Sequence, residues 1–106
     1  MHHGAARIDL HLPGVDSLKA KRSVLRRTEA RLRDELGVAV AEIGFQDRWR
    51  RAALGVATVS GSATGVDRVL DRVAAVVERD PRVEVVAVED LVDVLDADPP
   101  DLPPGS

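Results

Sequence analysis

The chain has 106 residues, no cysteine, 44% hydrophobic residues and a formal net charge of −3, which indicates one ordinary globular domain. The absence of cysteine excludes disulfides, thiolate catalysis and cysteine-based zinc sites. No segment approaches the roughly 18 apolar residues needed to span a bilayer, and the N-terminus lacks the apolar core of a signal peptide, so we expect a cytoplasmic protein with no membrane partner.

Charge is distributed unevenly along the sequence. Residues 17–51 carry ten Lys or Arg against five Asp or Glu, whereas residues from 83 onward carry seven acidic residues and no basic one. This asymmetry indicates an anionic partner near the first half of the chain, although it names no partner.

The first predicted elements are a strand over 6–12 and a helix from 17 to about 36. Apolar and polar residues alternate along the strand, which is the pattern of a half-buried strand, and Pro13 and Gly14 end it. Asp16 or Ser17 is the expected helix N-cap, and Gly37 the expected C-terminal stop.

Two further strands are predicted over 38–45 and 52–59, joined by a turn at 46–51. The second of them is apolar on both faces, which is typical of a central strand covered on both sides. An amphipathic helix follows, with Ser62 or Thr64 as its cap, and it ends before Pro81. Residues 83–95 predict a fourth strand, and the acidic, proline-rich tail 96–106 is expected to be disordered.

The predicted order of elements is therefore β-α-β-β-α-β, over a domain of residues 1–95. With right-handed crossovers, this order gives an α+β ferredoxin-like βαββαβ sandwich. Its two helices lie on one face of a four-stranded antiparallel sheet.

Two motifs in the chain resemble those of a known family. The first is the segment 17–22, SLKAKR, after a strand that ends in HLPG at 11–14. The second combines Glu42-Ile43, Gln46-Asp47, Arg51-Ala52 and the run LGVA at 54–57. Together they resemble the small bacterial YlxP-like proteins over roughly residues 6–95, with two departures: the family often has His at the position of Phe45 and Gln at that of Arg50.

The resemblance implies a ferredoxin-like fold, in agreement with the order of elements. The family is largely uncharacterised, and its members are typically encoded among translation and ribosome-maturation genes. A connection with RNA or the ribosome is therefore what the resemblance implies, by analogy only.

The predicted topology brings two basic segments to one end of the molecule. The helix that begins near residue 18 and the turn between the second and third strands lie at the same end of the sheet. The expected phosphate- or nucleic-acid-binding residues are Lys19, Lys21, Arg22, Arg48, Arg50 and Arg51. The alternative interpretation is a solvated rim balanced by Asp16, Glu42 and Asp47, which is the more common meaning of such charge clusters.

Lys21 differs from the other basic residues because it falls within the apolar stripe of its helix, with Leu18 and Leu25. We expect its stem to pack at the sheet edge while its ammonium reaches out of the core. Asp9, Glu42 and Asp47 are the candidate partners, and a structural ion pair is favoured over catalysis.

Phe45 and Trp49 are the only aromatic residues, and both flank the predicted turn. Beside arginines they would suit stacking against single-stranded RNA. A lone tryptophan more often caps a core or packs in a subunit contact, which is the interpretation favoured here. The first strand has no aromatic residue, so the sequence does not resemble an RRM.

No motif predicts catalysis or a cofactor. Asp9 and His11 share one strand face, but two ligands are too few for a metal site. The serines have no evident histidine base, and the loop 61–65 lacks the lysine of a P-loop. We therefore expect a non-enzymatic, RNA- or ribosome-associated protein without a cofactor. The alternative is a small-ligand-binding or regulatory homodimer that pairs through its open sheet face.

Overall fold

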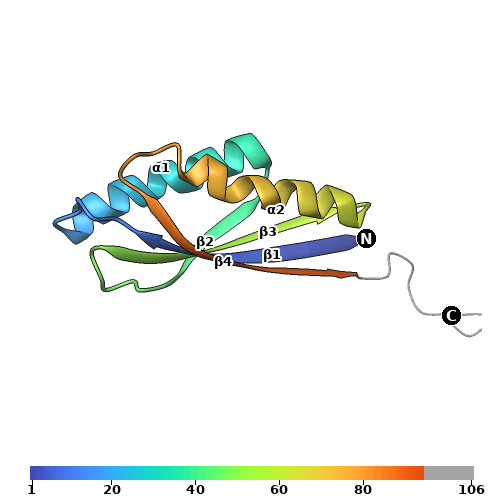
Figure 1. The fold of residues 1–106 in the computed structure, drawn as a ribbon, viewed down its shortest axis with the longest axis horizontal. Coiled ribbons are helices and arrows are strands. Elements are labelled where there is room, and N and C mark those ends of the chain that lie inside the picture. The colour runs from blue at the N-terminus through green and yellow to red at the C-terminus, as the bar shows by residue number, and fades with distance from the viewer. Residues whose placement is uncertain (95–106) are drawn as a thin grey trace, which may run out of the picture.

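The computed structural model describes residues 1–94 and contains six elements (Figure 1). In chain order they are β1 His2–His11, α1 Leu18–Leu36, β2 Ala39–Gly44, β3 Arg51–Ser60, α2 Ala63–Val77 and β4 Glu84–Val94. The predicted β-α-β-β-α-β order is confirmed. The prediction of a disordered tail over 96–106 lies outside the described residues.

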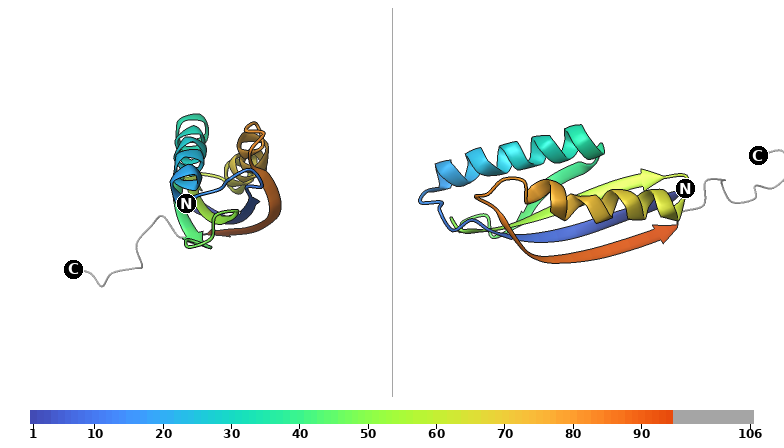
Figure 2. Two further views of the ribbon diagram at one scale, coloured as in Figure 1. Left: turned by 90° about the vertical axis from the view of Figure 1, so that its left-hand side faces the viewer. Right: turned by 45° about the horizontal axis from the view of Figure 1, so that its top comes forward.

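The four strands form one antiparallel sheet in the order β2-β3-β1-β4. Both helices cover the same face of this sheet, as Figure 2 shows. The structure is thus the ferredoxin-like α+β sandwich expected from the sequence. The opposite face of the sheet, called the outer face below, carries no helix from residues 1–94.

The core lies between the helices and the sheet and consists of branched aliphatic side chains. Each of them contributes roughly 1.5–3 kcal/mol when fully buried. The core includes Ile8 and Leu10 of β1, Leu25 and Leu32 of α1, Leu54 and Val56 of β3, and Val66, Leu70 and Val73 of α2.

Both helices are capped where the sequence predicts. Ser17 Oγ accepts the N–H of Ala20 at 3.0 Å, and Ser62 Oγ accepts that of Gly65 at 3.0 Å. Gly37 ends α1 with φ 64°, and its N–H donates to the carbonyl oxygen of Arg33 at 2.9 Å.

Two details of the strands differ from the prediction. β1 begins at His2 rather than residue 6, because it pairs on both sides: His2 lies opposite Ser60 of β3 and Val94 of β4. β3 is central, as expected, but the helices cover only one of its faces. Ala57 is exposed on the outer face, so the expectation of cover on both sides is wrong for the part of the chain described.

The two ends of the sandwich differ in what they carry. The β1–α1 loop, the start of α1 and the β2–β3 hairpin lie together at one end, on the left in Figure 1. The N-terminus and the end of β4 lie at the other. Within residues 1–94, no helix is long and apolar enough to cross a membrane.

Candidate functional site

The β2–β3 hairpin is fastened to the β1–α1 loop by backbone and side-chain bonds. The N–H of Leu12 donates to the carbonyl oxygen of Arg50 at 2.9 Å, and Arg50 Nε donates to that of Val15 at 3.2 Å. The start of β3 therefore has a fixed position beside the segment that leads into α1.

Lys21 provides the second attachment of the hairpin. Only 2% of its surface is exposed, and its Nζ donates to the carbonyl oxygens of Phe45 at 2.6 Å and Arg48 at 2.7 Å. Glu42 Oε2 lies 3.8 Å from the same nitrogen. A buried ammonium is tolerated only where such acceptors replace its water shell, so this group of atoms is a specific anchor for the turn.

The turn held by Lys21 has an unusual backbone conformation at Phe45. Its φ is 58°, in the left-handed region that non-glycine residues rarely adopt, and the N–H of Arg48 donates to its carbonyl oxygen at 3.0 Å. The guanidinium of Arg51 lies over the ring of Phe45, 4.8 Å from its centroid. The Lys21 ammonium and this cation–π contact both stabilise the turn.

Outside this anchor, the hairpin presents an open hollow of about 520 Å³, lined by Asp47, Arg48, Trp49, Arg50 and Arg51. Trp49 is 51% exposed. Lys19 and Arg22, in the first turns of α1, are exposed at the same end of the molecule. We call this surface the cationic end, defined by Lys19, Arg22, Arg48, Trp49, Arg50 and Arg51.

The six predicted binding residues lie at one end of the molecule but in different environments, and only hairpin residues line the hollow. Lys19, Arg22 and Arg48 are exposed, and no ion pair among residues 1–94 involves their side chains. Arg50 is exposed but donates to Val15, and Arg51 is partly buried against Phe45.

Two sequence-based expectations about this region are corrected. The ammonium of Lys21 does not reach out of the core: it is buried under backbone carbonyls, and of its three candidate carboxylates only Glu42 lies near it. Lys21 is therefore not placed to contact phosphate. Trp49 does not cap the core, because half of its surface is exposed, whereas the alternative part of that expectation, a subunit contact, stays a prediction.

The backbone acceptors of Lys21 could not be found from side-chain patterns. The only sequence signal is a lysine at a stripe position of α1 combined with a polar turn at 46–51. Every residue has a backbone carbonyl, so residue types do not show which carbonyls accept hydrogen bonds from Lys21. The sequence therefore indicated carboxylate side chains as its partners.

The other polar groups singled out from the sequence are engaged elsewhere. Asp9 Oδ1 accepts from Arg7 Nε at 3.1 Å, and His11 Nδ1 lies 3.1 Å from Glu84 Oε2. Within residues 1–94, no three His, Asp or Glu side chains gather as a metal site would require.

The loop between α2 and β4 holds an ion pair that the sequence analysis did not identify. Asp80 accepts from the backbone N–H, Nε and Nη2 of Arg82 at 3.0, 2.9 and 2.7 Å. The side-chain hydrogen bonds from Arg82 are the main reason that the pKa of Asp80 falls to about 2, against the opposing effect of burial. This pair fixes the entry into β4.

Comparison with known protein sequences identifies a relative of this chain. The chain is 37% identical over 81 residues to the uncharacterized protein YlxP of Bacillus subtilis, covering 76% of this chain and 88% of that protein.

Two solved structures resemble the fold at low sequence identity. The de novo designed protein Foldit4 has a TM-score of 0.51 at 13% identity, covering 91% of this chain and all of that one. SnoaB, a cofactor-independent oxygenase from Streptomyces nogalater, has a TM-score of 0.50 at 12% identity, covering 95% of this chain and all of that one. At such identities these likenesses concern the fold alone.

A family model described as "Protein of unknown function (DUF503)" matches residues 4–90. With this match and the relationship to YlxP, the chain belongs to the DUF503 family.

Proposed function

We propose that this protein is a non-enzymatic, cytoplasmic RNA- or ribosome-associated protein that contacts RNA through the cationic end. The observation that carries the proposal is Trp49, half exposed in a hollow whose other lining residues are three arginines and one aspartate. An exposed aromatic ring beside guanidinium groups matches the chemistry of single-stranded RNA, whose bases stack while its phosphates pair with cations.

The anchoring of the hairpin supports this proposal. Lys21, whose charge is offset by Glu42 at 3.8 Å, is buried beneath the turn and ties it to α1. It also fixes the backbone at Phe45 and Arg48, on either side of the turn that leads to Trp49. A prearranged surface loses less conformational entropy on binding than a mobile loop.

The proposed contacts come from three exposed cations, Lys19, Arg22 and Arg48, with the free guanidinium nitrogens of Arg50 beside them. Asp47 lies in the same hollow and reduces the positive charge there. We therefore expect moderate affinity and a strong dependence on salt concentration.

Charge reversal at the cationic end tests the proposal. The double variant K19E/R48E should lose binding of single-stranded RNA in filter assays and co-sedimentation with purified ribosomes. The matched control is R68E/R72E, which reverses two exposed arginines of α2 and should bind as the wild type does. Equal binding by the two variants, or no binding by the wild type, would refute the proposal.

A second candidate function is that of a ligand-binding or regulatory homodimer. The uncovered outer face favours self-association, since Ile43 and Val59 are 49% and 64% exposed there. Salt separates the two functions, because contacts between apolar faces do not weaken steeply as salt rises. Light scattering that gives a monomer mass at tens of micromolar protein would refute self-association.

A further inference from the structure

The outer face of the sheet is divided into an apolar half and a charged half. On β2 and β3 its residues are small or aliphatic: Ala39, Ala41, Ile43, Gly55, Ala57 and Val59. On β1 and β4 the outer face carries Arg7, Asp9 and Glu89, together with the small residues Ala5 and Ala87. Arg7 lies opposite Gly55 on one side and Glu89 on the other, so by residue position the boundary runs between the two central strands. The Arg7 side chain itself crosses β3 toward β2, where a Cβ on Gly44 would lie 3.6 Å from its Nη2.

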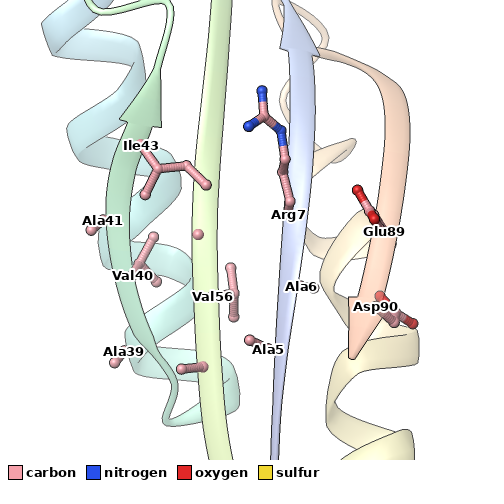
Figure 3. Close-up of a pocket in the computed structure, with 12 residues that line it drawn as sticks. Ala5, Ala6, Arg7, Ala39, Val40, Ala41, Ile43, Val56, Glu89 and Asp90 are labelled. Carbon is pink, nitrogen blue, oxygen red and sulfur yellow. The ribbon is translucent and has the colours of Figure 1, made fainter. Parts of the chain in front are cut away.

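An open hollow of about 620 Å³ lies on this face, with residues of both halves along its sides (Figure 3). Ile43 of β2 reaches across β3, where a Cβ on Gly55 would come within 3.1 Å of its Cγ2. No part of residues 1–94 covers the hollow. The small side chains of β2 and β3 project little from the sheet, so another flat surface can approach this face closely.

The size of the face fits a second copy of the chain. Three strands of ten or eleven residues and one of six give a plan area of roughly 500–600 Å². Two such faces in contact would bury roughly 1,000–1,200 Å², which is near the lower limit of specific protein interfaces. A small ligand would leave most of the outer face exposed.

The charged half has incomplete pairing within one copy. Arg7 Nε donates to Asp9, yet 44% of the Arg7 side chain remains exposed. Arg7 is in register with Glu89, but no ion pair joins them, and in Figure 3 the Arg7 guanidinium extends along the sheet away from Glu89. Arg7 and Glu89 can therefore each accept a partner from outside the chain.

We propose that two copies pack outer face to outer face about a two-fold axis that crosses the strands. This inference rests on the proposed self-association and adds its geometry. With this axis the apolar half of one copy covers that of the other, and β1 and β4 face their own counterparts. An axis near the level of Ile8 would bring Arg7 against the partner's Asp9, reciprocally.

The other simple arrangement, with the axis parallel to the strands, stacks β1 on β3 and β4 on β2. It would place Arg7 against the partner's Gly55 instead of the partner's Asp9, so the guanidinium would lose water without gaining a second carboxylate. The chosen axis also has a consequence for function. It reverses strand direction between copies, so the two cationic ends lie at opposite ends of the dimer and act as separate contact sites.

Charge complementation distinguishes the two arrangements. R7E leaves only acidic side chains at positions 7, 9 and 89, and D9K/E89K leaves only basic ones at these three positions. Each variant alone should dimerise at least about tenfold more weakly than the wild type, because like charges face each other. An equimolar mixture should recover the dimer mass in light scattering. Circular dichroism should give both variants the wild-type fold, since these side chains lie at the surface.

A matched pair of substitutions locates the interface. Ala57→Glu places a charge in the apolar half of the outer face and should give a monomer, whereas Ala75→Glu on the exposed side of α2 should leave the dimer intact. A dimer that survives Ala57→Glu would overturn the use of this face.

The outcomes separate the proposals. A monomeric wild type overturns both self-association and this geometry, and leaves RNA contact untouched. A dimeric wild type whose charge variants fail to recover in the mixture overturns the axis alone. Recovery in the mixture, with a monomeric Ala57→Glu variant, supports the arrangement.

Discussion

The Nζ atom of Lys21 lies 2.6 Å from the carbonyl oxygen of Phe45, which is the one non-glycine residue with a positive φ within residues 1–94. A buried cation from a helix thus holds the strained position of a hairpin that is distant in sequence. The conformation at Phe45 sets the course of the chain through the exposed residues 48–50. The shape of the cationic end therefore depends on Lys21, whose side chain is buried and cannot contact a partner.

Replacing Lys21 by methionine tests this dependence, because methionine keeps the apolar stem and removes the ammonium. Two hydrogen bonds from a charged donor are lost, at about 1.5–3 kcal/mol each before relaxation. We expect the free energy of unfolding to fall by about 2–4 kcal/mol, measured by urea denaturation. Lys19→Met, on the exposed side of the same helix, should change stability by less than about 0.5 kcal/mol.

The same pair of variants should differ in fluorescence. Trp49 is the only tryptophan, so its emission reports on the hairpin alone. Lys21→Met should lower the fluorescence anisotropy of Trp49, because the turn loses its anchor and moves more freely. Lys19→Met should leave this anisotropy unchanged. Identical anisotropy in both variants would show that the hairpin keeps its conformation without Lys21.

The C-terminal end of α1 gives a prediction about backbone conformation. Gly37 has φ 64°, and a Cβ there would meet no atom within 4 Å, so the cost of alanine is conformational. Gly37→Ala should lower the free energy of unfolding by about 1 kcal/mol. Gly14→Ala is the control, since it also has open space but no positive φ. A loss in Gly14→Ala as large as in Gly37→Ala would contradict this explanation.

The pair of Asp80 and Arg82 predicts a pH dependence of stability. The pKa of Asp80 is about 2 in the folded state, against 3.8 for an unperturbed carboxyl group. Its contribution is therefore fully present only above about pH 5 and is lost progressively as the pH falls to about 1. Because Arg82 is partly exposed, solvent screening limits this contribution to about 1–2 kcal/mol.

Asp80→Asn should remove that contribution at neutral pH, so the variant should be less stable than the wild type at pH 7. The difference should shrink as the pH falls and approach zero only below about pH 2, because at pH 2 the wild-type carboxyl is about half protonated. Thermal melts across this pH range measure it, with Asp71→Asn on the exposed surface of α2 as the control. A difference that does not vary with pH would indicate that Asp80 acts only through packing.

The fold could be predicted because its signals are local. Ser17 and Gly37 mark the ends of α1, and alternation along β1 gives the buried face. The start of β1 could not be predicted, because His2 joins the sheet through backbone pairing with neighbours on both sides rather than through its own side-chain pattern.

The candidate site was predictable only in part. Topology alone places Arg48 and Arg22 at one end, because the first helix and the hairpin must meet there. The partners of Lys21 and the exposure of Trp49 follow from how the turn at Phe45 folds back over the helix. That conformation depends on the positive φ of Phe45, which is rare for a non-glycine residue. The identity of the residue as phenylalanine does not indicate such a backbone angle.

The salt dependence of RNA binding tests the central proposal most directly. For a single-stranded RNA, the logarithm of the wild-type binding constant should fall linearly with the logarithm of salt concentration. Arg48→Gln and Arg22→Gln should each make that slope shallower by about 0.7, one phosphate contact, while Arg68→Gln on α2 leaves it unchanged. A flat wild-type slope, or the same slope in the Arg48 and Arg68 variants, would contradict a phosphate contact at the cationic end.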